Sequence, residues 1–259
     1  MSAAARERTA IPLLPLRTQA AMFVRLFAIQ GSWNYELLVG NGVAFSVEPA
    51  LRRLDGGVNG SAYREALARQ ARYFNAHPYL AAVAVGALAR AELDGNAPTQ
   101  IERFRTALPG PLGSVGDRLV WAGWLPFCSL LALLAFGLGA GPWATLLLFL
   151  ATYNVGHIGL RAWGLRVGWR HGLRVASALG NPVLRQGPQH LARAVALLAG
   201  VAIPLALLRL IGPDRNVVGT SVLAAMLISL GLARLHGRVP GWRVAFGVLV
   251  IFALLSIAK

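Results

Sequence analysis

The polar cluster Gln30-Gly31-Ser32-Trp33-Asn34-Tyr35-Glu36 holds the side-chain types that recognition of a sugar needs. Amides and carboxylates can satisfy sugar hydroxyl groups, and a tryptophan offers a flat apolar surface to the C–H face of the ring. The predicted substrate-binding residues here are Gln30, Ser32, Trp33, Asn34 and Glu36. On a helix, three of them (Gln30, Trp33 and Asn34) would share one face. The composition of this cluster fits a second interpretation equally well, namely a belt of aromatic and polar residues at the membrane interface.

The stretch Gly110-Pro111-Leu112-Gly113-Ser114-Val115-Gly116-Asp117 combines helix-weakening residues with one carboxylate, just before a long apolar region. Many transporters build a binding site from such a broken helix at membrane depth. We therefore predict a break here, with Asp117 near the substrate. Gly110, Gly113 and Gly116 would form a gating or structural motif. Alternatively, Asp117 is the N-cap of the first long span, with Arg118 as its ionic partner.

Signatures of catalysis are missing from the sequence. It has no Gly-x-Ser-x-Gly, no His-Glu-x-x-His and no Gly-Lys-Ser/Thr phosphate loop, and Cys128 is its single cysteine. The five histidines are scattered, and each is interpreted as a packing or interface residue. We expect no catalytic residue, no metal site and no cofactor.

The composition indicates a membrane protein. The 259 residues are 56% hydrophobic and only 14% charged, against about 25% charged in soluble domains. The net charge of +15 comes from arginines, because Lys259 is the only lysine. These arginines lie between apolar runs. We therefore interpret them as signals of membrane topology and expect no nucleic-acid partner. The predicted fold is an all-α integral membrane protein, with amphipathic and re-entrant helices before about five transmembrane helices.

Three regions follow from this pattern: a flexible N-terminal tail (1–17), an amphipathic and re-entrant helical region (18–118) and a transmembrane region (119–259). Thr18–Val39 is expected to be an amphipathic helix at the membrane interface. Tyr79–Ala91 is too short to span a bilayer, so it is expected to be re-entrant or packed on protein.

Five apolar runs are candidate spans: Leu119–Ala140, Pro142–Leu160, Leu191–Ile211, Val217–Leu235 and Val244–Ala258. Gly139–Pro142 would join the first two as a hairpin. The next connection would carry the arginines from Arg161 to Arg185 and no acid, so the positive-inside rule places it in the cytoplasm. The N-terminus would then be cytoplasmic and Lys259 outside.

Three motifs in order carry a family resemblance. They are the cluster from Gln30 to Glu36, the run Tyr73-Phe74-Asn75-Ala76-His77-Pro78-Tyr79, and the stretch from Gly110 to Asp117 followed by Trp121. Together they resemble subunit IID of the mannose/fructose/sorbose-family sugar phosphotransferase system. The resemblance adds Asn75, His77 and Pro78 to the gating or structural motif. Arg118 departs from the family pattern, in which a small residue or proline usually follows the aspartate.

The resemblance implies a non-catalytic permease subunit of the bacterial inner membrane. It would pair with subunit IIC to carry a hexose, which the cytoplasmic subunits IIA and IIB phosphorylate. The implied assembly is a trimer of IIC–IID heterodimers in membrane lipid. Two alternatives are a diverged IID-like protein with a regulatory or scaffolding role and no transport, and a membrane-embedded enzyme that uses Asp117 and a histidine.

Overall fold

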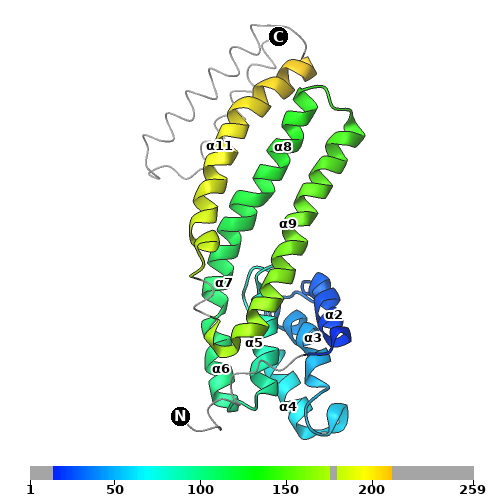
Figure 1. Cartoon of the computed structure of the whole chain (residues 1–259), viewed down its shortest axis with the longest axis vertical. Coiled ribbons are helices and arrows are strands. Elements are labelled where there is room, and N and C mark those ends of the chain that lie inside the picture. Colours follow the sequence, from blue (N-terminus) through cyan, green and yellow to red (C-terminus); the bar gives the residue numbers. More distant parts are fainter. Residues whose placement is uncertain (1–13, 176–179, 212–259) are drawn as a thin grey trace.

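The computed structural model of the chain describes residues 14–175 and 180–211. It is helical, as expected, and has two parts (Figure 1). Short helices pack together around one end of α9, and three long helices, α8, α9 and α11, run side by side away from them. The last two expected spans, Val217–Leu235 and Val244–Ala258, lie outside the described residues.

Among the described residues, three helices are long and apolar enough to cross a membrane: Pro98–Gly137, Pro142–Arg174 and Leu184–Leu210. The second expected span lies within the second helix, and the first and third overlap the other two helices except for their last residues. The expected hairpin is also present, because only four residues separate the end of α8 (Leu125–Gly137) from the start of α9 (Pro142–His171). Gly139 takes a positive φ of 113° in this turn, and the Ala140 amide donates to the Ala135 carbonyl at 2.9 Å. Glycine adopts such a φ at little cost.

The predicted break between Gly110 and Asp117 is wrong. The stretch forms α7 (Pro109–Gly116), which follows α6 (Pro98–Ala107) after a bend at Leu108 and continues into α8 through a π-helix, η4 (Asp117–Trp124). Pro109 and Pro111 lie in the first turn of α7, where a missing N–H breaks no helical hydrogen bond. The helix therefore tolerates its prolines and widens only at η4, and π-helical turns often occur at functional sites.

The predicted helix over Thr18–Val39 is also wrong in its second half. The chain forms α2 (Leu16–Arg25) and the 3₁₀ turn η2 (Leu26–Ala28), and then follows an irregular path to α3 (Gly40–Leu51). Beyond α3 come η3 (Gly57–Asn59), α4 (Ser61–Gln70) and α5 (Ala81–Leu93). Gly56 and Gly57 have positive φ in the turn before α4. Residues Gln30 to Glu36 are therefore a loop, and they do not share a helix face.

Helix α5 is packed on protein, one of the two arrangements expected for it. Almost all its residues are buried, mainly against α9. Three glycines bring the two backbones close together, because a Cβ on Gly86, Gly164 or Gly168 would crowd the facing helix. Small residues permit such close approach between membrane helices.

Helix α9 continues past the expected end of the second span at Leu160. It runs to His171, so Arg161, Arg166 and Arg170 lie on a helix and the expected loop does not begin there. Its last turns pack against α5 and are followed by η5 (Gly172–Arg174). Protein contacts, which hydropathy does not report, stabilise this extension.

Candidate functional site

The loop from Gln30 to Glu36 is closed by Asn34. Its side-chain Oδ1 accepts hydrogen bonds from the backbone N–H groups of Glu36 (3.0 Å) and Leu37 (2.8 Å). Asparagine commonly closes turns in this way, because its side chain can bind the backbone of the residues that follow. Trp33 and Tyr35 contact each other edge to face at 4.9 Å, and both are exposed. The loop therefore presents aromatic and polar side chains, including Gln30, Ser32 and Glu36, at the surface of the protein.

Backbone hydrogen bonds join this loop to the second motif. The Phe74 amide donates to the Leu37 carbonyl, and the Val39 amide donates to the Phe74 carbonyl, each at 3.1 Å. Leu38, between these contacts, has a φ of 51°, in the left-handed region that a branched side chain rarely adopts. The first two motifs are thus locked together at a strained residue, which is typical of functional loops.

The second motif packs directly against the third. His77 is buried and lies so close to α7 that a Cβ at Gly116 would overlap its side chain. The ring of Trp121 in η4 lies 5.0 Å from the His77 ring. Asn75 lies nearby, since its carbonyl oxygen would be 3.8 Å from a Cβ at Gly113. Gly116 therefore has a steric role, whereas no neighbour of Gly110 in the described part of the chain is close enough to require glycine.

The electrostatics of His77 follow from this burial. Its Nδ1 accepts a hydrogen bond from the Tyr79 amide at 3.2 Å, so the neutral ring carries its proton on Nε2. Burial, together with the positive charge of Arg161, lowers the pKa of His77 to about 4. His77 is therefore neutral at physiological pH. Its neighbour Pro78 is also buried and begins the turn that leads to α5.

The place where the three motifs contact one another is called the motif junction below. Three residues of α9 complete it: Tyr153, His157 and Arg161. The Tyr153 and Tyr79 hydroxyl groups are 2.6 Å apart, and the His157 ring lies 4.8 Å from that of Tyr79. The Arg161 guanidinium lies 4.2 Å from the centre of the Tyr79 ring, and its Nε donates to the Leu26 carbonyl at 3.2 Å. Sequence reasoning missed this set, although the spacing of four residues places all three on one helix face.

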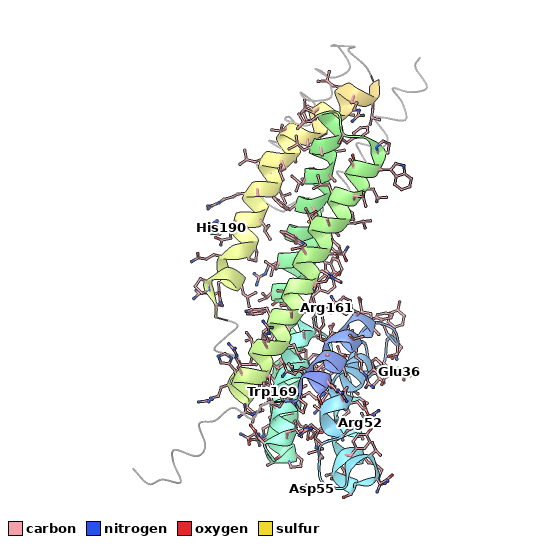
Figure 2. All side chains as sticks on the ribbon, turned by 45° about the vertical axis from the view of Figure 1, so that its right-hand side comes forward. Glu36, Arg52, Asp55, Arg161, Trp169 and His190 are labelled. Carbon is pink, nitrogen blue, oxygen red and sulfur yellow. The ribbon has the colours of Figure 1, made fainter. Side chains whose placement is uncertain are left out.

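Arg161 is buried with no carboxylate paired to it among the described residues. Figure 2 shows it on α9, facing the N-terminal helices, with Glu36 at their outer edge. One guanidinium nitrogen of Arg161, Nη1, is buried without a hydrogen-bond partner there, as is His77 Nε2. Buried cations of this kind are costly unless aromatic rings or backbone carbonyls compensate them, and here both do.

Asp117 and Arg118 lie on the exposed side of η4. Asp117 is not an N-cap, because α7 precedes it without interruption. It makes no ion pair with Arg118, whose Nε donates to the Ser114 carbonyl at 3.1 Å. The structure therefore brings the three motifs together through Phe74, His77 and Gly116. No hydrogen bond or ion pair in the described part of the chain joins Asp117 to the Gln30–Glu36 loop.

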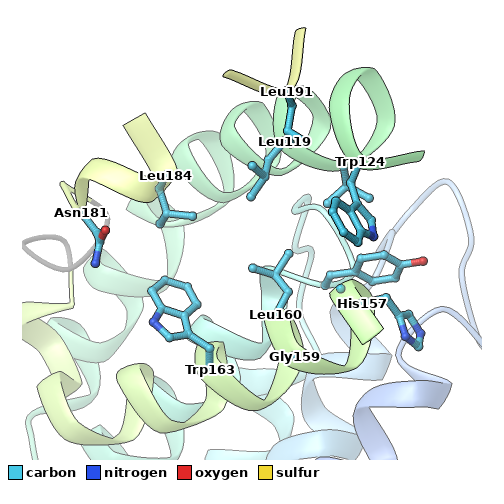
Figure 3. Close-up of a pocket in the computed structure, with 12 residues that line it drawn as sticks. Leu119, Trp124, His157, Gly159, Leu160, Trp163, Asn181, Leu184 and Leu191 are labelled. Atoms are coloured by element: carbon cyan, nitrogen blue, oxygen red, sulfur yellow. The ribbon is translucent and has the colours of Figure 1, made fainter. Parts of the chain in front are cut away.

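A cavity of about 370 Å³ adjoins the junction between η4, α9 and the start of α11 (Pro182–Ile211). Trp124, Leu160 and Trp163 face it, as Figure 3 shows. Its lining is mostly apolar, with His157 and Asn181 as polar members. The Trp124 indole donates to the Tyr153 carbonyl at 3.3 Å, which fixes one wall of the cavity.

Residues 14–203 match the family model of the PTS system mannose/fructose/sorbose family IID component. This match covers well over half of the chain. The chain belongs to this IID family. The three motifs indicated the same family.

Relatives of this IID chain include the mannose-specific EIID component of Escherichia coli K12. It is 33% identical over 175 residues, which are 64% of this chain and 59% of that protein. The sorbose-specific EIID component of Klebsiella pneumoniae is 28% identical over 92% of both chains. A chain in the cryo-EM structure of the mannose transporter ManYZ with microcin E492 has the same fold, with a TM-score of 0.58, 22% identity, and coverage of 95% and 98%.

Proposed function

We propose that this IID chain is the non-catalytic half of a sugar permease. It pairs with a IIC subunit in the bacterial inner membrane and translocates a hexose, which cytoplasmic IIA and IIB subunits phosphorylate. The working unit would be a trimer of IIC–IID heterodimers. The N-terminal helices would face the cytoplasm, on the side of Arg166 and Arg170, and the C-terminus would lie outside.

One observation carries this proposal beyond family membership: the three motifs form one connected structure. Separate sequence segments are held together by the backbone bonds of Phe74, the close packing of His77 on Gly116, and the side chains of α9. The loop from Gln30 to Glu36, called the motif loop below, can move together with the long helices only if such a rigid link joins them, because packed contacts transmit displacement. The region 18–118 would thus position the loop, and the region 119–259 would anchor the subunit in the membrane.

The substrate assignment is part of the same proposal. Gln30, Ser32, Trp33 and Glu36 are exposed on the loop that Asn34 closes. An exposed loop is suited to a site that a second subunit completes. Asp117 is exposed on η4 and free of ion pairs with other described residues. It is therefore available to accept a hydrogen bond from a hydroxyl group or from the IIC subunit.

Asn34 allows a sharp test, because its two side-chain atoms have separable roles. Asn34→Asp keeps the oxygen that closes the loop and removes the amide donor, which in the free chain donates to the Ser32 carbonyl at 3.3 Å. Asn34→Ala removes both. Each variant is expressed with its IIC, IIA and IIB subunits in a strain lacking its own IID, and hexose uptake is measured. We expect Asn34→Asp to reduce uptake by tenfold or more, equivalent to about 1.4 kcal/mol, while membrane insertion and co-purification with IIC are unchanged. Asp117→Asn should behave similarly.

Normal uptake in both Asn34→Asp and Asp117→Asn would remove the site assignment. A wild-type chain that binds IIC yet fails to restore uptake would favour the regulatory or scaffolding alternative. The enzyme alternative has less support, because no hydrogen bond links Asp117 to a histidine within residues 14–175 and 180–211. Turnover of a substrate by the purified chain without partner subunits would revive it.

A further inference from the structure

A second hollow lies between η4 and α11, apart from the motif junction. This groove has a volume of about 490 Å³. Arg118, Arg185 and Gln189 form its polar part, and Val115, Ala122 and Leu184 belong to its apolar part. Both arginines are exposed, one on each of the two helices that border the groove. The groove therefore combines a positive mouth with an apolar wall.

Within residues 14–175 and 180–211, no acid pairs with the positive charge of the groove. Arg118 uses its Nε on the Ser114 carbonyl, which leaves its two terminal nitrogens available. No ion pair among the described residues involves Arg118 or Arg185. The sequence also has no acid from Arg118 to Pro213. The groove is therefore suited to an anion that comes from outside the chain.

The position of the groove identifies the class of anion. Arg118 is the last charged residue on its helix, because residues 119–137 have no charge. On α11, the segment between Arg193 and Arg209 is likewise uncharged. Arg118 therefore lies where an apolar span meets water, and Arg185 precedes the apolar part of α11 by about two turns. Both positions are close to the level of lipid headgroups. Basic pockets between transmembrane helices on the cytoplasmic side are suited to anionic headgroups.

We propose that this groove binds an anionic phospholipid. The phosphate contacts the guanidinium groups of Arg118 and Arg185, Gln189 donates to a headgroup oxygen, and an acyl chain lies along Val115, Ala122 and Leu184. Arginine suits this role because its fork of N–H groups matches phosphate oxygens. The lipid holds η4 against α11, so it stabilises the helix that carries Trp121 into the motif junction.

The experiment compares lipid binding by the purified full-length chain and two double variants. Arg118→Gln/Arg185→Gln neutralises the groove. Arg166→Gln/Arg193→Gln removes the same charge from exposed positions that do not line it. Titration with phosphatidylglycerol or phosphatidylcholine is followed by native mass spectrometry. Each basic residue near a headgroup contributes about a fivefold gain in affinity, so the groove variant should bind phosphatidylglycerol about thirtyfold more weakly. The control variant should keep the preference of the wild-type chain for phosphatidylglycerol.

The results distinguish a specific lipid site in the groove from a general attraction of anionic lipid to the positive charge of the chain. Equal losses in both double variants, or no loss in the groove variant, would overturn the proposal. Displacement of phosphatidylglycerol by inorganic phosphate at equal concentration would assign the groove to free phosphate and also overturn it. Release of the lipid when the IIC subunit is added would show that a protein partner covers the groove, with the same consequence. Gel filtration and circular dichroism of both variants confirm that they fold, and none of these measurements depends on sugar uptake.

Discussion

The N-terminal helices and the long helices differ in where their apolar side chains lie and in whether their charged side chains are paired. In α3 and α5, apolar residues are buried, and the nearby acids pair with arginines. Along α9 and α11, large apolar side chains such as Trp143, Val155 and Leu197 are exposed, and neither helix has an acid. The first region is thus built like a soluble domain, whereas the second requires lipid around it.

Glu48 illustrates how the first region satisfies its charges. Arg25 (2.6 Å), Arg52 (2.5 Å) and Tyr63 (2.9 Å) all donate to its carboxylate. Burial raises the pKa of this carboxyl, but the hydrogen bonds from Arg52, Tyr63 and Arg25 outweigh burial, so its pKa lies below the usual value. The network joins α2, α3 and α4. The motif loop is therefore supported by a rigid scaffold, as a positioned binding loop requires.

The largest predicted effect tests whether buried charges stabilise this scaffold. Glu92 on α5 accepts hydrogen bonds from both Nε (3.0 Å) and Nη2 (2.9 Å) of Arg69, and from Gln70 at 2.7 Å. Glu92→Ala would leave the mostly buried Arg69 without a counterion. Loss of one member of a buried pair costs about 3–5 kcal/mol. We expect a loss of that size in the free energy of unfolding, measured in detergent by denaturant titration.

Glu102→Ala is the matched control for this variant. Glu102 pairs with Arg72, but both side chains are well exposed, at 41% and 65%. Exposed pairs contribute about 0–1 kcal/mol, so this variant should be nearly neutral. Similar losses for the two variants would contradict the view that burial makes the Glu92 pair important.

A second prediction concerns His77, where the two regions meet. The unfolded chain would protonate this residue near pH 6.5, whereas burial and Arg161 lower its folded pKa to about 4. The unfolded state therefore binds more protons between these values, so stability is complete above pH 6.5 and falls as the pH drops toward 4. The slope reaches about 1.4 kcal/mol per pH unit, for a total loss of up to about 3 kcal/mol. Melting temperatures across this range measure it.

His77→Asn should flatten this pH dependence, because asparagine does not titrate. His190→Asn is the control, since His190 is exposed and points away from the other long helices on α11 (Figure 2). It should keep the slope of the wild-type chain. An unchanged slope in His77→Asn would assign the pH dependence to other groups and would remove His77 as the titrating link between the regions.

Sequence reasoning was most successful where hydropathy alone decides the structure. Apolar length located α8, α9 and α11, and Gly139–Pro142 indicated the hairpin between the first two. It failed where packing or turn chemistry decides. Asn34 closes a loop by binding two backbone N–H groups, and helical spacing of the neighbouring polar residues hid this role. Prolines in the first turn of α7 were interpreted as a break, although a helix accepts them there.

The motif junction shows the same limit. The order of the three motifs indicated the family, but their contact with each other depends on tertiary packing that one sequence does not report. Tyr153, His157 and Arg161 could have been found from their spacing, since they repeat every four residues on a helix. The pair Gly164 and Gly168 was also readable as a small-residue contact face. That α5 is the helix packed against these glycines could not be predicted, because the apolar residues of α5 do not lie on one face.

The smallest predicted effect tests the contact that joins the two regions. In Gly168→Ala, the new methyl group would overlap the Val83 carbonyl and lie 2.8 Å from the Ala87 nitrogen. The backbones of α5 and α9 would have to separate, at a cost of about 1–3 kcal/mol. Gly159→Ala is the control on the same helix, because no atom of the described residues lies within 4 Å of that methyl position. Alanine favours helix by up to about 1 kcal/mol over glycine, so the control should be neutral or more stable. If Gly168→Ala were as stable as Gly159→Ala, the close approach of α5 and α9 would not be what holds the scaffold to the membrane helices.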